Sequence, residues 1–130
     1  MAAFNAQACY REHQITTADR GQLLLMVYDG MLRSLAEGQR AMGAQRIEVQ
    51  HTSITKAQRL LAELITTLDH QANPQLATQL DNLYRFMFDS LTRANVYDDA
   101  QLLSDVIGLL KELRSAWAQA DATVRSQAVA

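Results

Sequence analysis

The stretch NPQLATQLDNLYRFMFDSLTRA, residues 73–94, carries the clearest indication of the fold. Asn73 followed by Pro74 is typical of a helix start, because asparagine caps free N–H groups and proline fits the first helical position. Apolar residues then recur every three or four positions, which places them on one face of an α-helix. They are Leu76, Leu80, Leu83, Met87, Leu91 and Ala94. The stretch therefore predicts a long amphipathic helix, which we expect to end at Asn95.

The same spacing appears three more times and predicts helices over about 18–42, 46–70 and 98–119. We expect Gly43 to stop the first of them, and Asp98, with Gln101 three residues later, to cap the last. Short connections between long amphipathic helices make sequential neighbours antiparallel. The predicted fold is all-α: an antiparallel up-down four-helix bundle over residues 17–119, with a flexible N-terminal segment at 1–16 and a disordered tail at 120–130.

Composition and charge agree with one globular domain and argue against several functions. The chain has 130 residues and a net charge of −2, whereas proteins that wrap nucleic acid or anionic lipid need a large excess of Lys and Arg. The longest apolar run, Leu23 to Tyr28, is far shorter than a membrane span. The first residues lack the pattern of a secretory signal. The single cysteine, Cys9, permits no internal disulfide and favours a reducing intracellular setting.

The apolar faces are wider than a bundle core requires. A stripe of little more than about 100° is enough for a core, but apolar residues between Leu23 and Leu32 span about 200°. Excess apolar surface is typical of a partner site, and here it predicts a groove that receives an apolar helix. Phe4, Tyr10 and Ile15 lie in the N-terminal segment. We therefore expect that segment to lie in the groove when the partner is absent.

Catalytic and metal sites have little support in the sequence. A di-iron bundle requires two Glu-x-x-His pairs, and the chain has one, Glu48 with His51. Cys9 and His13 lie in the segment that we expect to be flexible, where a nucleophile and its base do not stay oriented. We expect no catalytic residue, no metal, no cofactor and no enzymatic activity. Two alternatives stay open: a histidine phosphotransfer bundle that uses His51, and a dimerising helical domain without a client.

Several motifs of the chain form a recognisable combination. They are QLLLMVYDG at 22–30, Lys56-Ala57 with the following leucines, LDNLYRFM at 80–87, LTRAN at 91–95, the segment from Leu110 to Trp117, and Tyr10. Together, over about residues 10–118, they resemble the flagellar export chaperone FliS family. The resemblance implies a cytoplasmic helical bundle that binds the C-terminal segment of newly made flagellin, prevents premature polymerisation and keeps flagellin competent for type III export. It also implies that the chaperone's own N-terminal segment occupies part of the same groove.

Under this interpretation, eight apolar and aromatic residues line or support the flagellin groove, and Tyr10 and Ile15 form its cap. The sequence leaves open which of the eight face the groove and which belong to the core. The expected partners are flagellin, further flagellar export or regulatory proteins, and a second copy of the chain in a homodimer. We expect no nucleic acid and no membrane insertion. The eight residues are Tyr28, Leu83, Tyr84, Phe88, Leu91, Val106, Leu110 and Trp117.

Overall fold

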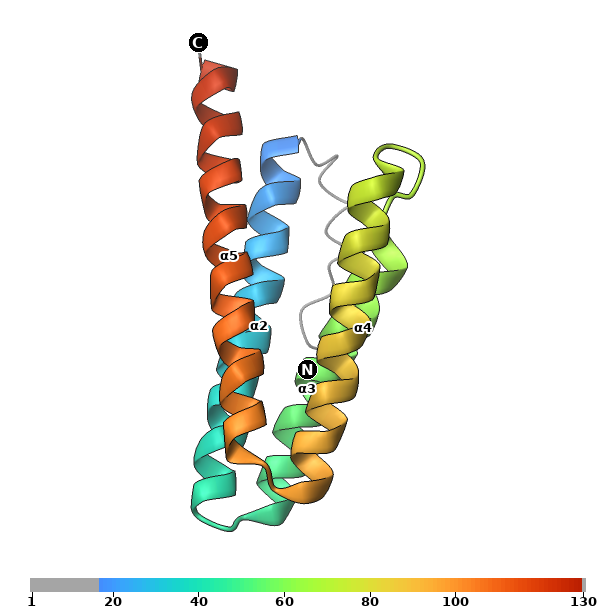
Figure 1. The fold of residues 1–130 in the computed structure, drawn as a ribbon. Helices are drawn as coiled ribbons and strands as arrows, with labels where there is room; N and C mark the ends of the chain where they lie inside the picture. Colours follow the sequence, from blue (N-terminus) through green and yellow to red (C-terminus); the bar gives the residue numbers. More distant parts are fainter. Residues whose placement is uncertain (1–16, 130) are drawn as a thin grey trace.

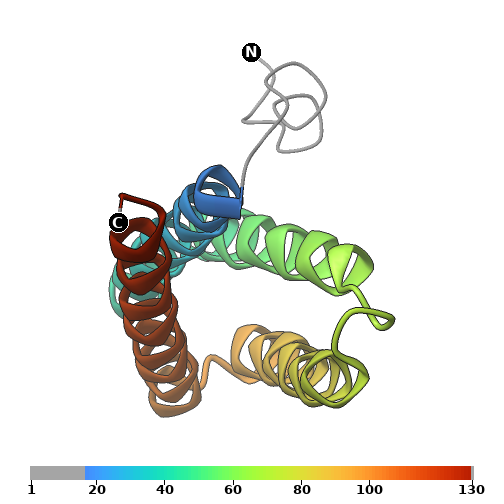
Figure 2. The same ribbon diagram turned by 90° about the horizontal axis from the view of Figure 1, so that it is seen from above.

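The computed structural model describes residues 17–129, which form four long helices. They are α2 (Thr17–Gly43), α3 (Ile47–Thr67), α4 (Pro74–Tyr97) and α5 (Ala100–Val129). Each helix runs opposite to its neighbour in sequence (Figure 1). Both α2 and α4 pack against α3 and α5, so the helices form the four sides of a bundle (Figure 2). The prediction of an antiparallel up-down four-helix bundle is confirmed.

The core is one cluster of buried side chains from all four helices. Most of its members fall at the three- and four-residue spacing of the amphipathic pattern. Each buried leucine- or methionine-sized side chain stabilises the fold by about 1.5–3 kcal/mol relative to exposure. The deeply buried members include Tyr28, Met31 and Leu35 on α2, Ile54 and Leu61 on α3, Tyr84, Met87 and Leu91 on α4, and Leu103, Val106 and Leu110 on α5.

The predicted start of the third helix is confirmed. Asn73 Oδ1 accepts a hydrogen bond from the Leu76 N–H at 3.2 Å, and Pro74 lies at the first helical position. The helix before it, α3, ends at Thr67 rather than near His70. The chain becomes extended at the next residue and turns before α4, so the last turn expected for this helix does not form.

The predicted boundary between the third and fourth helices is wrong by one to two residues. The third helix does not end at Asn95 but continues to Tyr97, and Asp98 takes the left-handed conformation with φ 52°. The residue that caps α5 is Asp99 rather than Asp98, because Asp99 Oδ1 accepts the Leu102 N–H at 3.0 Å. The turn therefore uses two successive aspartates, one to leave α4 and one to begin α5.

Gln50 of α3 explains why Asn95 does not end the helix. The Gln50 side chain is buried, and its Nε2 donates to the backbone oxygen and the Oδ1 of Asn95 at 3.3 and 3.1 Å. The same nitrogen donates to Asp98 Oδ1 at 2.9 Å. Asn95 Nδ2 also lies 3.2 Å from His51 Nδ1. Asn95 is therefore held against the neighbouring helix, and the left-handed turn falls at Asp98.

The fourth helix is also longer than predicted. It ends at Val129 rather than near Gln119, so residues 120–129 are helical and do not form the expected tail. No glycine or proline follows Gly108, so nothing in this part of the sequence interrupts the helix. Only the first of the extra residues lie beside the beginning of α2, and α5 then extends past it (Figure 1).

Asp121 joins these extra turns of α5 to α2. Its buried carboxylate accepts hydrogen bonds from Gln22 Nε2 at 2.8 Å and from Arg125 Nε at 3.0 Å, and these bonds lower the pKa of Asp121. The other carboxylate oxygen has no hydrogen-bond partner within residues 17–129. It lies against Gly21, where a Cβ atom would overlap it. Glycine at this position therefore allows α2 and α5 to approach each other.

We expect Gly21→Ala to lower the melting temperature of the wild-type chain but to raise it in an Asp121→Ala background. The added methyl meets the carboxylate in the first case. In the second case the carboxylate is gone, and helix propensity favours alanine over glycine by about 1 kcal/mol. Thermal unfolding of the four proteins measures both effects. A change of the same sign in both backgrounds would contradict this account of Gly21.

Candidate partner-binding surface

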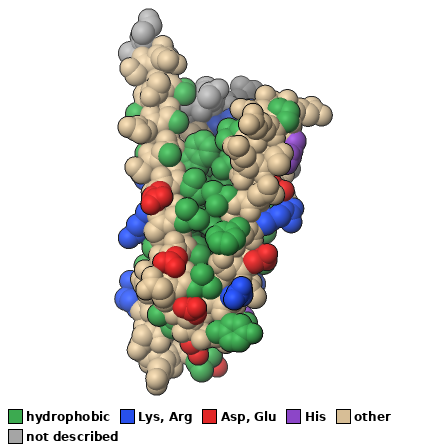
Figure 3. All heavy atoms as spheres, in the orientation of Figure 1, with side chains coloured by type: hydrophobic (Ala, Val, Ile, Leu, Met, Phe, Trp, Pro, Cys, Tyr) green, Lys and Arg blue, Asp and Glu red, His purple; other side chains and the backbone are tan. Residues whose placement is uncertain are grey.

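The surface between α4 and α5 is apolar over much of its length. The two helices lie close at their short connection and diverge towards the opposite end (Figures 1 and 2). In the space-filling view, hydrophobic side chains gather in a strip between them, with acidic and basic side chains on both sides (Figure 3). We name this strip the α4–α5 face. It comprises Leu80, Leu83 and Phe86 on α4 and Leu109, Leu113 and Trp117 on α5.

Contacts on the other sides of the two helices fix the direction of this face. On α4, the side towards α3 is marked by Gln58 Nε2, which donates to the backbone oxygen of Phe88 at 3.0 Å. Phe86 lies on the opposite side of the helix and is 59% exposed. On α5, the side towards α2 is marked by Arg114, which binds both carboxylate oxygens of Asp29 at 2.9 and 3.2 Å. Leu109 and Leu113 therefore point towards α4.

The α4–α5 face leads into a pocket of about 270 Å³ at the end of the bundle where α3 passes into α4. We name it the loop-end pocket. Leu80 and Trp117 belong both to the face and to the pocket lining. The lining is mainly apolar, with one carboxylate from Asp69. The lining residues are Leu24, Leu64, Thr67, Leu68, Asp69, Ala72, Asn73, Leu76, Ala77, Leu80, Tyr84 and Trp117.

Three aromatic side chains from three helices are hydrogen-bonded beneath the pocket. The hydroxyl oxygens of Tyr28 and Tyr84 lie 2.8 Å apart, and Trp117 Nε1 donates to the Tyr28 hydroxyl at 3.1 Å. Both tyrosines are buried, and this burial raises the pKa of each hydroxyl. Trp117 is partly exposed. The aromatic triad therefore fixes the Trp117 ring at the surface through a contact made in the core.

The structure divides the eight predicted groove residues into three groups. Five are buried in the core cluster, so they support the surface without being accessible to a partner. Leu83 and Trp117 are partly exposed on the α4–α5 face. Phe88 is partly exposed but lines a separate hollow of about 440 Å³ with Ile65 and Ala62 of α3. The five core residues are Tyr28, Tyr84, Leu91, Val106 and Leu110. Tyr10 and Ile15, the predicted cap, lie outside the described residues.

The predicted set omitted four residues of the α4–α5 face, namely Leu80, Phe86, Leu109 and Leu113. Phe86 is the most exposed side chain of the α4–α5 face, and Leu113 contributes to it from α5. For Phe86 the sequence did carry a signal of exposure, because this residue lies about 100° around the helix from the core direction. For Leu113 the sequence carried no such signal, because it falls within the apolar stripe of its helix.

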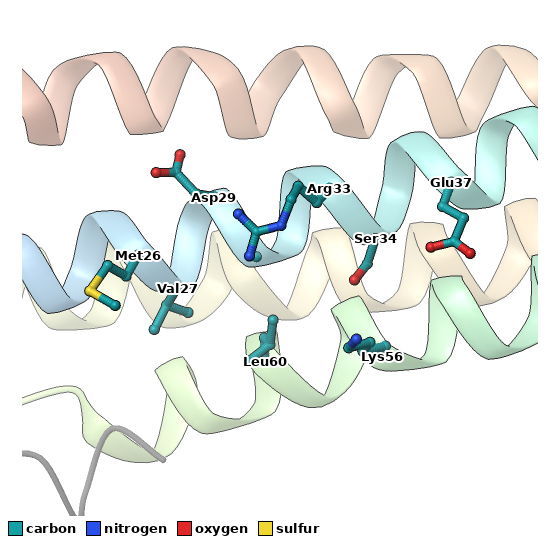
Figure 4. Close-up of a pocket in the computed structure, with 9 residues that line it drawn as sticks. Met26, Val27, Asp29, Arg33, Ser34, Glu37, Lys56 and Leu60 are labelled. Atoms are coloured by element: carbon teal, nitrogen blue, oxygen red, sulfur yellow. The ribbon is translucent and has the colours of Figure 1, made fainter. Parts of the chain in front are cut away.

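A further hollow, of about 490 Å³, lies between α2 and α3. Figure 4 shows Arg33, Ser34 and Glu37 along α2, with Leu60 and Lys56 facing them from α3. Four of its nine lining residues are charged, namely Asp29, Arg33, Glu37 and Lys56, so it differs in character from the α4–α5 face. Among the described residues, no group of three or more His, Cys, Asp or Glu side chains has the arrangement of a metal site. No described helix is long and apolar enough to cross a membrane.

The fold and the accessible apolar strip define a class of protein, namely a helical bundle suited to binding an apolar segment of another chain. The family model described as "Flagellar protein FliS" matches residues 2–124, and the chain belongs to this family. The resemblance noted in the sequence is confirmed.

Curated relatives support the assignment over most of their length. The chain is 32% identical to the flagellar secretion chaperone FliS of Bacillus subtilis over 120 residues, which are 92% of this chain and 89% of that protein. It is 34% identical to the flagellar secretion chaperone FliSB of Pseudomonas aeruginosa, over 82% of this chain and 84% of the relative. The corresponding Vibrio cholerae FliS is 32% identical, with 83% and 79% covered. The chain is therefore a chaperone of flagellar secretion and not an enzyme.

Proposed function

We propose that the α4–α5 face binds the C-terminal segment of flagellin in the bacterial cytosol, prevents its premature polymerisation and keeps it competent for flagellar type III secretion. The observation that carries this proposal is the accessible apolar strip on a member of a secretion chaperone family. A chaperone must cover apolar client surface without altering it chemically. The partly buried Leu83, Leu113 and Trp117 offer a surface of that kind.

The depth and length of the face suit a client that folds as it binds. A disordered segment loses about 2–5 kcal/mol of interaction energy when it becomes ordered, so the complex must bury a large apolar area. The face runs along both helices and continues into the loop-end pocket. The acidic side chains beside the strip would remain in solvent at the edge of such a complex.

Titration of the protein with a flagellin C-terminal peptide tests the proposal. Calorimetry should show saturable binding near one to one with a negative heat-capacity change, and circular dichroism should show a gain of helix. Sedimentation of the free protein, measured beforehand, shows whether a second copy of the chain already occupies the face. Absence of binding by the monomeric protein would contradict the proposed function.

Removal of residues 1–16 should strengthen flagellin binding and leave the bundle folded. The reason is the apolar character of Phe4, Tyr10 and Ile15, which we propose compete with the client for the groove. Calorimetry of the shortened and full-length chains measures the change in affinity, and thermal unfolding checks the bundle. A Tyr10→Ser/Ile15→Ser variant of the full chain should show the same gain. Equal or weaker binding by the shortened chain would contradict the competition.

A further inference from the structure

Two consecutive residues of α2 hold α5 at neighbouring positions. Tyr28 accepts a hydrogen bond from Trp117 Nε1 at 3.1 Å, and Asp29 binds the guanidinium group of Arg114 at 2.9 and 3.2 Å. Arg114 and Trp117 are three residues apart, so they are neighbours on the same side of α5. The Asp29 contact joins the two helices, whereas the Tyr28 contact also sets the position of an aromatic ring.

The two contacts differ in their access to water. The Tyr28 side chain is fully buried, and its hydroxyl also lies 2.8 Å from that of Tyr84, which holds it in place. Asp29 and Arg114 remain partly exposed, so water can replace their hydrogen bonds and the ion pair contributes little. Loss of the Tyr28 hydroxyl, by contrast, deprives the indole N–H of its acceptor in the core, and the ring is then no longer tied to one orientation.

Trp117 lies where the α4–α5 face meets the loop-end pocket. Its side chain is partly exposed, belongs to the face and lines the pocket together with Leu80. A client segment that extends from the face into the pocket would therefore contact this ring. Aromatic side chains supply much of the binding energy at protein interfaces, and a ring that is already ordered loses less conformational freedom on binding. The orientation of Trp117 in the free protein therefore affects the affinity for the client.

We infer that Tyr28 is a positioning residue for client binding, whose buried hydroxyl holds the Trp117 ring in its client-binding orientation before the client arrives. This inference rests on the proposed function and deepens it, because it assigns part of the affinity to a residue that the client does not touch. Tyr28 acts on binding only through Trp117. Replacement of Trp117 should therefore abolish the influence of the Tyr28 hydroxyl on the affinity.

The free protein shows directly whether Tyr28 holds the ring, because Trp117 is the only tryptophan of the chain. In the Tyr28→Phe variant, time-resolved fluorescence anisotropy should detect wider local motion of the indole than in wild type. Asp29→Asn is the matched control, because it weakens the neighbouring contact between α2 and α5 but keeps the Tyr28 hydroxyl. Its indole should move as in wild type. Unchanged motion in Tyr28→Phe, or an equal increase in Asp29→Asn, would overturn the inference.

A measurement on the wild-type chain avoids any effect of the substitutions on folding. The indole N–H of Trp117 should exchange its hydrogen with solvent more slowly in the folded protein than in the chain unfolded by denaturant, because the Tyr28 hydroxyl accepts it in the core. Nuclear magnetic resonance resolves this single indole signal. Exchange as fast as in the unfolded chain would overturn the inference.

Calorimetry with the flagellin C-terminal peptide tests the effect on binding in a double-mutant cycle. Tyr28→Phe should weaken binding about fivefold, the usual effect of one side chain that must be ordered on binding, and Asp29→Asn by no more than about twofold. In a Trp117→Phe background, Tyr28→Phe should have no further effect. No loss for Tyr28→Phe, or an equal loss in both backgrounds, would overturn the inference while leaving the proposed function in place. Failure of the wild-type chain to bind the peptide would overturn the proposed function, and this inference with it.

Discussion

Leu113→Glu is expected to weaken binding of the flagellin C-terminal peptide at least a hundredfold while the bundle stays folded. Leu113 lies on the α4–α5 face and is partly exposed in the free protein, so a glutamate there remains solvated until the client arrives. Binding would then bury a carboxylate without a partner, which is strongly unfavourable. Calorimetry measures the affinity, and circular dichroism checks the helix content.

Ser115→Glu is the matched control for this variant. Ser115 is exposed on the same helix, two residues away, and points away from the α4–α5 face. The Ser115→Glu variant introduces the same charge into the same helix. Its affinity for the flagellin peptide should remain within about twofold of wild type, as expected for an exposed charge. Equal losses for the two variants would indicate a general effect of negative charge. A larger loss for Phe88→Ala than for Leu113→Glu would place the client in the hollow between α3 and α4.

The helices could be predicted from the sequence because their signal is local. Apolar spacing and the Asn73-Pro74 start depend on residues close together in the chain, and the structure confirms both. The helix ends were predicted less well because they depend on distant contacts. Asn95 is a good helix terminator by composition, but Gln50 holds it against α3. Asp121 of α5 packs against Gly21, which lies a hundred residues earlier in the chain.

The candidate surface could be predicted only in part, for a related reason. Angular position on a helix gives the direction of a side chain but does not show whether a neighbouring helix covers it. Tyr28 and Tyr84 belong to the apolar pattern and are buried, whereas Leu83 and Leu113 belong to it and stay partly exposed. The difference arises from the divergence of α4 from α5, a property of helix packing (Figures 1 and 2).

The protein is expected to lose stability steeply above pH 10, by up to about 3 kcal/mol per pH unit for the buried tyrosine pair. Burial raises the pKa of both Tyr28 and Tyr84 above the ordinary value of 10.0. Their stabilising effect is therefore complete below pH 10, where the unfolded chain also keeps the hydroxyls protonated. As the pH rises further, the unfolded chain ionises while the folded chain does not, and unfolding is favoured. Denaturant unfolding between pH 9 and pH 11 measures the change.

The Tyr28→Phe/Tyr84→Phe double variant isolates this effect, because every other ionisable group remains in place. Its stability should fall less steeply with pH than that of the wild type, even if the variant is less stable at pH 7. The two single variants should show intermediate slopes, since each keeps one buried hydroxyl. Equal slopes for wild type and double variant would mean that the hydroxyls ionise in the folded protein. The triad would then be open to solvent and not enclosed by the core as the structure has it.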